Sequence, residues 1–419
     1  MSFFKTGVWG RPPHTGTRSD ILVVGGGLAG LSAVSALIDQ DLDEEVHIFE
    51  PRSRSQYVRD RTWCMWDVGE NPLTELATHR WHDWIVRDDS RVVHAHSGDH
   101  PYVRLPADLV YERLLSRAEA APNVHLHFGA AADRIDPEVT GVQVTTPHGE
   151  FSGRVALDSR PRPGRPSRNS LLQSFVGWEV RTRDPVFDPA VVTLMDFRLC
   201  KAGAIEFFYV LPLTEHRALV ESTVFAPNVI GRAYHEQRIK SYVQRTLNTS
   251  LVEIEYSEQG VIPMGFDHQP GPARSGVVEI GLRGGVAKPS TGYAFQRIQA
   301  DSKRLAHQVV HRTARASARG SSPRSRLLDR IFLSFLRHQP HLAPNAFLDL
   351  FDRVPTDDLI KFLTETGSVA VDLRVVRALP PTPFLREVLR FAQPGLRWSA
   401  DPSTAMRFDR DERSVLQAQ

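Results

Sequence analysis

The sequence predicts an α/β fold in which a Rossmann-type domain carries an inserted antiparallel β-sheet and is followed by a helical C-terminal region. Three features of the chain indicate this arrangement. A strand that begins near residue 21 runs directly into a glycine-rich turn and a helix. Short β-rich segments separated by turns occupy most of residues 175–256. Helical periodicity, interrupted by prolines, dominates the chain beyond residue 301.

The first strand, turn and helix have the pattern of a βαβ unit. Ile21–Val24 is short, apolar and β-branched, which is typical of a buried strand. After the turn, apolar residues recur at helical spacing, and a second strand, Val46–Phe49, then ends at Glu50. The turn itself comprises Gly25, Gly26, Gly27, Leu28, Ala29 and Gly30.

Each part of this motif has a physical role in binding a dinucleotide. Gly25 permits the tight turn, Gly27 lets the backbone approach a pyrophosphate, and Gly30 allows the helix to pack closely on the strand. The N-terminus of the helix offers free N–H groups to the phosphates. Glu50 is placed to accept hydrogen bonds from the ribose hydroxyls. We therefore expect an ADP-containing dinucleotide here rather than an ordinary glycine-rich turn.

Further elements follow from periodicity and from turn residues. Asp108–Ala120 has helical spacing, and Val124–Phe128 reads as a strand. Val139–Thr146 and Phe151–Leu157 flank Pro147-His148-Gly149, which predicts a hairpin. The β-rich segments that follow are Phe175–Val180, Val191–Phe197, Ile205–Leu213, Arg217–Phe225 and Val252–Tyr256, with a helix expected at Tyr234–Leu247.

These elements predict a chain divided into interwoven units, as its 419 residues require. Residues 1–17 and 394–419 are expected to be tails. The dinucleotide-binding domain is discontinuous, at 18–60, 105–160 and 270–310. The β-rich substrate domain takes 61–104 and 161–269, and the helical region takes 311–393.

The composition excludes several classes of protein. With 41% hydrophobic and 24% charged residues, the chain has no apolar run that could span a bilayer and no apolar signal segment. Cys64 and Cys200 are the only cysteines, which argues against a disulfide framework or a metal site. A net charge of +2 gives no indication of nucleic acid. We expect a cytoplasmic protein; its oligomeric state is not predicted.

A second glycine-rich turn follows the β-rich insertion. The strand Val278–Ile280 leads into Gly281, and Gly284 and Gly285 come before a helix. Backbone N–H groups in such a turn can bind an anionic group. A dinucleotide fold that is interrupted by a β-rich insertion and returns to such a turn is the layout of many FAD enzymes. The two turns together favour FAD over NAD as the bound nucleotide.

Short motifs spread over about residues 20–310 occur in the order known from one family. They are Asp60–Trp63, Phe175–Val180, Met195–Arg198, Phe208–Leu213, Leu219–Thr223, Glu258–Met264, Ile280–Gly285 and Ser290–Phe295. In this set the chain resembles the bacterial FAD-dependent lycopene cyclases of carotenoid biosynthesis. One departure is Ser159 in Asp158-Ser159-Arg160, where the family tends to have glycine. That serine weakens the tight turn expected beside the flavin.

The resemblance implies conversion of the open ψ end group of lycopene, or of a related carotenoid, into a β-ionone ring. A proton adds to the terminal double bond, the cation closes the ring, and a neighbouring proton leaves. The reaction is redox-neutral, and the family is thought to use reduced FAD, with NAD(P)H as the reductant. The flavin then acts as an electrostatic or acid–base partner.

Two carboxyls are candidates for the proton transfer. If Arg217–Phe225 is a strand, Leu219, Glu221 and Thr223 share one of its faces. A carboxyl among apolar neighbours has a raised pKa and can stay protonated. By the strand pattern alone Glu221 reads as a partly exposed residue, but it matches the glutamate that the family is thought to use. Asp196 is the second candidate.

Aromatic residues are the other requirement, because a polyene needs an apolar tunnel and a carbocation is favoured over π faces. Trp63, Trp66, Phe208 and Tyr209 are the candidates, although most aromatic residues in any protein serve the core. Two further residues are candidates for contacts with the cofactor. They are Asp158 and Arg61, and Arg61 would pair with the flavin, with Glu50 or in a surface ion pair.

A lipid-borne substrate also requires contact with a bilayer surface. Lys303–Arg330 is rich in Lys and Arg, and Leu327–Leu336 offers an apolar helix face. Together they predict a peripheral docking surface, whereas the pattern alone favours an ordinary helix with its apolar face in the core. Two other functions remain open: an FAD-dependent hydroxylase, and a flavin- or carotenoid-binding protein without activity.

Overall fold

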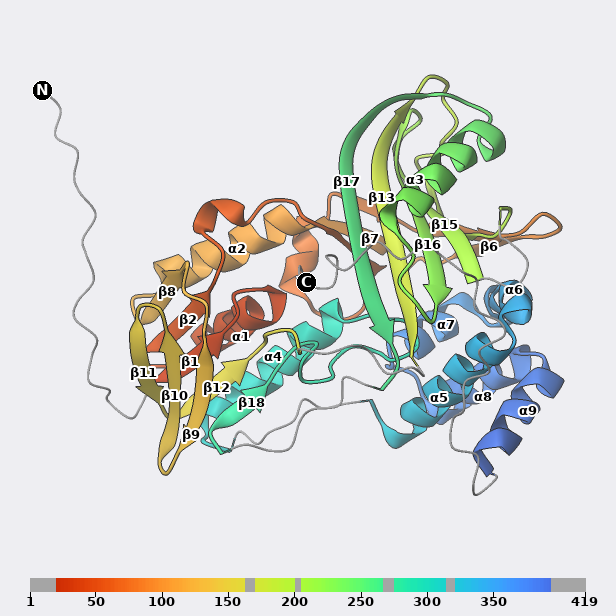
Figure 1. Cartoon of the computed structure of the whole chain (residues 1–419). Helices are drawn as coiled ribbons and strands as arrows, with labels where there is room; N and C mark the ends of the chain where they lie inside the picture. Colours follow the sequence, from red (N-terminus) through yellow and green to blue (C-terminus); the bar gives the residue numbers. More distant parts are fainter. Residues whose placement is uncertain (1–19, 163–169, 200–204, 267–274, 314–320, 393–419) are drawn as a thin grey trace, which may run out of the picture.

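The computed structural model describes residues 20–162, 170–199, 205–266, 275–313 and 321–392. The predicted tails and Cys200 lie outside these ranges. Figure 1 shows two β-rich regions side by side, a parallel sheet with α1, α2 and α4 and a long antiparallel sheet with α3 above the C-terminal helices. The predicted α/β fold with an inserted antiparallel sheet and C-terminal helices is confirmed.

The parallel sheet has the strand order β18-β12-β1-β2-β8. Its strands are β1 (Ile21–Val24), β2 (Val46–Glu50), β8 (Val124–Phe128), β12 (Val155–Asp158) and β18 (Val277–Glu279). One face packs against α1 (Leu28–Ile38), α2 (Ala107–Ala120) and α4 (Phe295–Val310). The other face is covered by a small antiparallel sheet of β9 (Arg134–Glu138), β10 (Gly141–Thr146) and β11 (Gly149–Gly153). Both faces of β1 are therefore buried, which explains its continuous apolar run.

The predicted hairpin at 139–157 is present but divided differently. Val139 lies fully exposed in the turn between β9 and β10, so β10 begins two residues later than predicted. The second predicted strand splits into β11 and β12. A Cβ at Gly153 would lie 2.6 Å from the carbonyl oxygen of Asp20, so the chain passes against β1 at this point. The next strand, β12, then belongs to the parallel sheet.

The second large sheet has the order β17-β13-β16-β15-β14-β5-β6, and only its β14–β5 pair is parallel. Its strands are β5 (Asp83–Arg87), β6 (Val92–His96), β13 (Leu171–Thr182), β14 (Val191–Asp196), β15 (Ile205–Thr214), β16 (Arg217–Ala226) and β17 (Leu251–Met264). β17 is much longer than the predicted Val252–Tyr256 because it pairs with β13 along its whole length. The predicted helix at 234–247 is α3 (Arg232–Ser241) followed by a π-helical turn, Tyr242–Thr246.

A third sheet, in the order β3-β7-β4, consists of β3 (Thr62–Trp66), β4 (His79–Trp81) and β7 (Tyr102–Pro106). Short 3₁₀ turns occur at Arg54–Gln56, Pro72–Leu76 and Pro340–Leu342. The C-terminal helices are α5 (Pro323–His338), α6 (Ala343–Arg353), α7 (Thr356–Leu363), α8 (Val369–Ala378) and α9 (Pro381–Ala392). Side chains of α5 to α8 form one core with the large sheet, while α3 packs on its opposite face.

Burial overturns the docking surface predicted at Lys303–Arg330 and Leu327–Leu336. Residues 314–320 lie outside the described ranges. Phe335 and Leu336 on α5 are 0% and 1% exposed and belong to the core with the large sheet. Only Leu327 remains exposed among the large apolar residues of that face. The apolar stripe of α5 is therefore a core face, as the pattern alone favoured. No helix in the described part of the chain is both long and apolar enough to cross a membrane.

Candidate functional site

The first glycine turn leaves open space at one position only. A Cβ at Gly25 (φ +97°) would lie 2.3 Å from Oγ of Ser159, and one at Gly30 would lie 1.9 Å from the carbonyl oxygen of Gly25. A Cβ at Gly27, by contrast, would meet no atom within 4 Å. Helix α1 begins directly after Gly27, and no side chain caps it. An anionic group can therefore approach the helix N-terminus at Gly27, which fits a pyrophosphate.

Glu50 ties the turn to the end of β2. Its Oε2 accepts a hydrogen bond of 2.6 Å from the backbone N–H of Gly26, and its Oε1 accepts one of 2.8 Å from Nε of Arg52. The hydroxyl of Tyr57 donates to the carbonyl of Gly26 at 2.8 Å. The ribose contact of Glu50 stays a prediction. Arg61 does not pair with Glu50 and instead forms an ion pair of 2.9 Å with Asp60.

The second glycine turn lies directly against the first. A Cβ at Gly281 (φ +60°) would lie 2.5 Å from Cβ of Ala29, in the first turn of α1. Gly284 is packed on the carbonyl of Glu279, and Gly285 has a positive φ. The two turns predicted to bind the cofactor are therefore brought together, with Gly27 left open beside them.

Asp158 and Ser159 connect these turns. Asp158 is buried, and its carboxylate accepts hydrogen bonds from Arg160 and forms an ion pair of 3.1 Å with Arg283. Ser159 has no positive φ, and its hydroxyl donates to the carbonyls of Val24 and Gly25. The serine therefore replaces the family glycine without backbone strain. Residue 25 favours glycine because of its positive φ, and the hydroxyl of Ser159 also occupies the place of a Cβ there.

A row of residues across the large sheet forms the second half of the site. Gly177 on β13 pairs with Glu221 on β16 and with Glu258 on β17, and Glu221 also pairs with Tyr209 on β15. Paired residues in a sheet point to the same face. Leu219 and Phe225 on this face of β16 belong to the core beneath the C-terminal helices, so the predicted face of β16 is present.

The surroundings of Glu221 favour its protonated form. Burial raises the pKa of Glu221 to about 8, and the neighbouring carboxyl of Glu258 acts in the same direction. The hydroxyl of Thr223, which donates to Oε1 of Glu221 at 2.7 Å, opposes the rise. Glu221 nevertheless keeps an intermediate exposure, so another molecule can reach it. At neutral pH it is an accessible carboxylic acid.

Aromatic residues and a thiol surround this acid. Trp66 lies 5.2 Å from Tyr102 and 6.2 Å from Tyr293, measured between ring centroids. Burial raises the pKa values of Tyr102, Tyr209, Tyr293 and Cys64, so all of these side chains are neutral. We call Cys64, Trp66, Tyr102, Tyr209 and Tyr293 the aromatic cluster. Glu221 is among the groups that act on the pKa values of Cys64, Tyr102 and Tyr209, so it lies beside this cluster.

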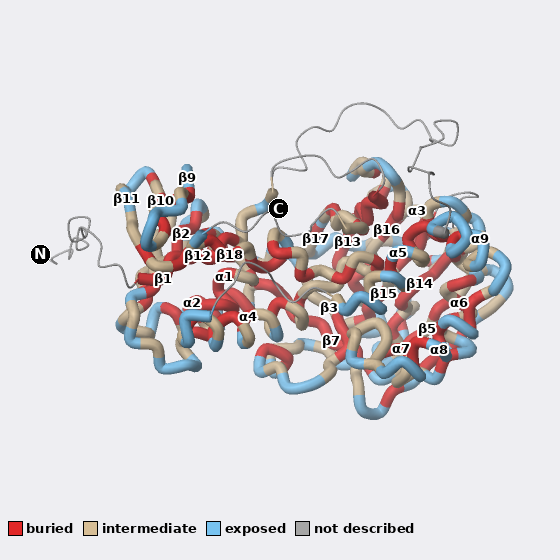
Figure 2. Tube along the Cα trace, turned by 90° about the horizontal axis from the view of Figure 1, so that it is seen from below, coloured by how far each residue is buried: buried red, intermediate tan, exposed pale blue. Residues whose placement is uncertain are grey.

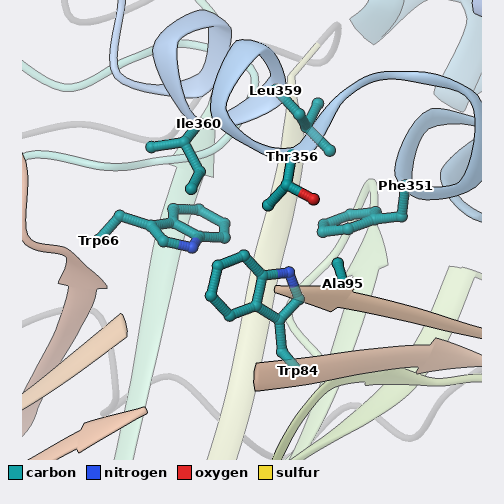
Figure 3. Close-up of a pocket in the computed structure, with 7 residues that line it drawn as sticks. All are labelled: Trp66, Trp84, Ala95, Phe351, Thr356, Leu359 and Ile360. Carbon is teal, nitrogen blue, oxygen red and sulfur yellow. The ribbon is translucent and has the colours of Figure 1, made fainter. Parts of the chain in front are cut away.

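An apolar gap borders Trp66 of the aromatic cluster, and Figure 3 shows the residues that line it. The space is too small to admit a water molecule. Trp66 and Trp84 meet edge to face there, with a centroid distance of 5.8 Å. The other lining residues are Ala95, Phe351, Thr356, Leu359 and Ile360. The gap therefore belongs to the core between the large sheet and α6 and α7, and not to the glycine turns.

Three of the predicted site residues lie elsewhere. Asp196 is fully buried, where it accepts hydrogen bonds from Arg198 and, at 2.7 Å, from the hydroxyl of Tyr242. Phe208 stacks on Tyr242 beneath α3, on the face of the sheet opposite Glu221. Trp63 packs against α2 and α4, in the core of the parallel sheet. The structure thus groups Trp66 and Tyr209 with Glu221, but not these three.

Sequence reasoning missed Glu258, Gly177 and the two tyrosines Tyr102 and Tyr293. Glu258, Gly177 and Tyr293 were included only as members of the short motifs, and Tyr102 was not singled out. Alternation along a strand would have separated Phe208 from Tyr209, and Trp63 from Trp66, because residues an odd number apart face opposite sides.

The fold defines the class of protein. It is similar to a geranylgeranyl bacteriochlorophyll reductase-like protein from Thermoplasma acidophilum, with a TM-score of 0.56 and 14% identity over 88% of this chain and 98% of that one. It is also similar to PqsL of Pseudomonas aeruginosa, a probable FAD-dependent monooxygenase, with a TM-score of 0.52 and 12% identity over 84% and 100% of the two chains. The chain thus has a Rossmann-type flavoprotein fold.

Sequence comparison narrows this class to one family. Residues 20–389 match the family described as lycopene cyclase protein, and the chain belongs to that family. A lycopene beta-cyclase of Pantoea ananas is 25% identical over 386 residues, which cover 87% of this chain and 96% of the relative. The resemblance read from the short motifs is therefore confirmed.

Proposed function

We propose that this protein cyclises the open ψ end groups of lycopene to β-ionone rings. Its membership of the lycopene cyclase family supports the proposal. The structural observation that supports it is the position of Glu221 beside the aromatic cluster, where burial raises its pKa to about 8. Ring closure needs one proton donor in surroundings that favour a carbocation, and both requirements are met around this side chain.

The side chains of the cluster have separate roles in this proposal. Glu221 donates its proton to the terminal double bond, and later takes back the proton that leaves the ring carbon. Trp66 and the tyrosines present π faces to the cation between these two steps. Because the tyrosines are buried and neutral, they add no negative charge that would trap the cation. The apolar walls exclude water, which would otherwise add to the cation.

The proposed cofactor is FAD, held between the two glycine turns, with its pyrophosphate at Gly27. Bound in its reduced form, FAD would supply an electron-rich ring near the cation without net transfer of electrons. NAD(P)H is the proposed reductant. Gly25, Gly30 and Gly281 support this assignment through the close packing that they permit around α1.

We expect lycopene to be converted anaerobically in the presence of chemically reduced FAD and in the absence of NAD(P)H. The reaction is redox-neutral, so no reductant is used up as rings form. The measurement is carotenoid analysis by absorption and chromatography, together with the amount of reduced FAD before and after the reaction. In a parallel aerobic assay, oxidation of NAD(P)H with uptake of oxygen and without ring formation would favour the hydroxylase; the solved neighbour PqsL is a probable FAD-dependent monooxygenase. An unchanged lycopene spectrum would favour a binding protein.

We also propose that the protein acts at the cytoplasmic side of a membrane, because lycopene partitions into lipid. Seven of the fifteen exposed large hydrophobic side chains in the described residues lie on α8 and α9; they are Val369, Leu373, Val376, Leu385, Val388, Leu389 and Phe391. The exposed charged residues of these two helices are all arginines, namely Arg374, Arg377, Arg386 and Arg390, whereas Asp372 and Glu387 are buried. Exposed apolar side chains among arginines suit an anionic lipid surface. Figure 2 colours the exposed residues of α8 and α9 pale blue.

The double substitution Leu385→Gln/Leu389→Gln should weaken binding to liposomes that contain anionic lipid. Each leucine side chain removed from lipid contact costs about 1.5–3 kcal/mol if fully buried there, so we expect a loss on the order of tenfold or more. Flotation measures the bound fraction, which should also fall as salt is raised. Val139→Gln, at an exposed apolar residue in the turn between β9 and β10, is the matched control. Equal flotation of the double variant and the wild type would reject α9 as the docking surface.

A further inference from the structure

A second carboxyl lies beside the proposed acid and has not been given a role. Glu258 is 5% exposed. It pairs with Gly177 from one side, and Glu221 pairs with the same glycine from the other side. Gly177 itself places no side chain between them, and the space above it is shared by Glu258 and by Cδ1 of Leu219. A Cβ at residue 177 would lie 3.2 Å from Cγ and 3.4 Å from Oε1 of Glu258, so this carboxyl leans over the glycine.

The two carboxyls differ in the charges that surround them. Oε2 of Glu258 accepts a hydrogen bond of 3.0 Å from the hydroxyl of Tyr256, and the guanidinium of Arg59 lies 3.7 Å above the centre of the Tyr256 ring. Burial raises the pKa of Glu258, while the hydrogen bond from Tyr256 and the charges of Arg59 and Arg104 act against this rise and favour its charged form. No cation is among the groups that shift the pKa of Glu221. When two carboxyls lie in unlike environments, the proton stays on the one that lacks the cations.

Charge balance leads to the same distribution. Arg59 and Arg104 carry two positive charges, and both form ion pairs with Glu179, at 2.5 and 3.1 Å. Glu179 and Glu258 together balance these two cations if Glu221 is neutral. Arg217 pairs with Glu255 and Glu179 at the exposed edge, and the pKa of His79 is lowered by burial, so this histidine is neutral. A charged Glu221 would be a second carboxylate beside Glu258 with no cation of its own.

The remaining titratable groups on this face do not disturb that balance. They are Cys64, Tyr102, Tyr209, Tyr256 and Tyr293, and burial raises the pKa of each. All of them are neutral at the pH at which Glu221 titrates.

We propose that Glu221 and Glu258 form a carboxyl pair across Gly177 that holds one proton, with the proton on Glu221 and the charge on Glu258. The proposal rests on the proposed cyclase function. Glu258 acts through Glu221 and is therefore a positioning residue. Its charge keeps the proton on Glu221 before the reaction and attracts a proton back to Glu221 afterwards.

The proton balance closes without a further reactant. Glu221 gives its proton to the terminal double bond, whose π electrons form the new C–H bond and leave a tertiary cation. The π electrons of a second double bond close the ring and move the cation to a ring carbon. The adjacent C–H bond then supplies the electrons of the ring double bond, and its proton returns to Glu221. Glu258 stays a carboxylate throughout, and no electron is gained or lost.

The pair can be tested in the cofactor-free protein, by infrared titration of the protonated carboxyl in H₂O and D₂O. The wild type should show one buried carboxylic acid with a midpoint near pH 8, which Glu221→Gln removes. In Glu258→Gln the repelling charge is gone, so the midpoint should fall by about one pH unit. The alkaline limb of the pH–rate profile for lycopene conversion should move by the same amount, and Glu258→Asp should restore it.

Further variants and readouts distinguish loss of the carboxyl pair from misfolding and from failure of the proposed function. Glu253→Gln removes an exposed carboxylate from the same strand and should leave the midpoint unchanged. If Glu258→Gln does not fold, Tyr256→Phe removes the hydrogen bond to Oε2 of Glu258 and keeps both carboxyls; Glu258 then holds its charge less firmly, and the midpoint of Glu221 should fall. An unmoved midpoint in the folded variant overturns the pair even if lycopene is converted. Failure of the wild type to convert lycopene overturns the function, while the infrared titration still decides the pair.

Discussion

Glu221→Gln should lower the rate of lycopene conversion by about 10²–10⁴-fold, the usual contribution of a general acid or base. Glutamine keeps the shape of the side chain and can still accept the hydrogen bond from Thr223, but it has no proton to give. The measurement is β-carotene formation by the purified variant in liposomes that contain lycopene. FAD binding should be unchanged, because Glu221 lies on β16 and the glycine turns lie at the parallel sheet.

The pH dependence of the wild type provides an independent check of the same role. The active form of Glu221 is its acid form, and its pKa is raised to about 8. Activity should therefore be retained through neutral pH and fall as the pH rises through about 8. This alkaline limb should be absent from the residual activity of Glu221→Gln. Near-normal activity in the folded, flavin-loaded variant would move the proton transfer away from Glu221. Asp196 would be a poor substitute, because Arg198 and Tyr242 engage its carboxylate on the opposite face of the sheet.

The sequence carried enough information to place Glu221 but not its partner. Alternation within β16 is a local property, so the shared face of Leu219, Glu221 and Thr223 followed from the strand alone. The position of Glu258 depends on how β17 pairs with β13. In that pairing Glu258 lies beside Gly177, which is more than 80 residues earlier in the chain. Register between distant strands is decided by the packing of whole sheets, which a single sequence does not display.

The difference between local pattern and long-range packing also explains why the docking surface was predicted on the wrong helix. The apolar stripe of α5 was visible in the sequence, but periodicity does not reveal what covers a stripe. In the structure the large sheet covers it, and the exposed apolar side chains lie instead on α8 and α9. The glycine turn was the opposite case, because the roles of Gly25, Gly27 and Gly30 depend on local backbone geometry that the spacing itself specifies.

Gly27→Val should abolish measurable FAD binding while leaving the protein folded. The backbone at residue 27 is extended, with φ −75° and ψ −171°, and a Cβ there meets no protein atom within 4 Å. Valine therefore fits the protein itself. Its methyl groups would fill the space through which the pyrophosphate reaches the N-terminus of α1. Loss of two hydrogen bonds to a charged group, each worth about 1.5–3 kcal/mol, weakens binding by about 10²-fold or more.

This substitution is more informative than a change at a neighbouring glycine. A side chain at Gly30 would collide with the carbonyl of Gly25, so Gly30→Val would lose FAD through damage to the fold. Gly98→Val is the matched control, since Gly98 also has open space around it but lies between β6 and β7, away from the glycine turns. Fluorescence titration with FAD and thermal unfolding should show a folded Gly27→Val protein without the cofactor, and a Gly98→Val protein that binds it normally. Undiminished FAD affinity in Gly27→Val would mean that the pyrophosphate does not lie at the N-terminus of α1, because no other contact of that residue is altered.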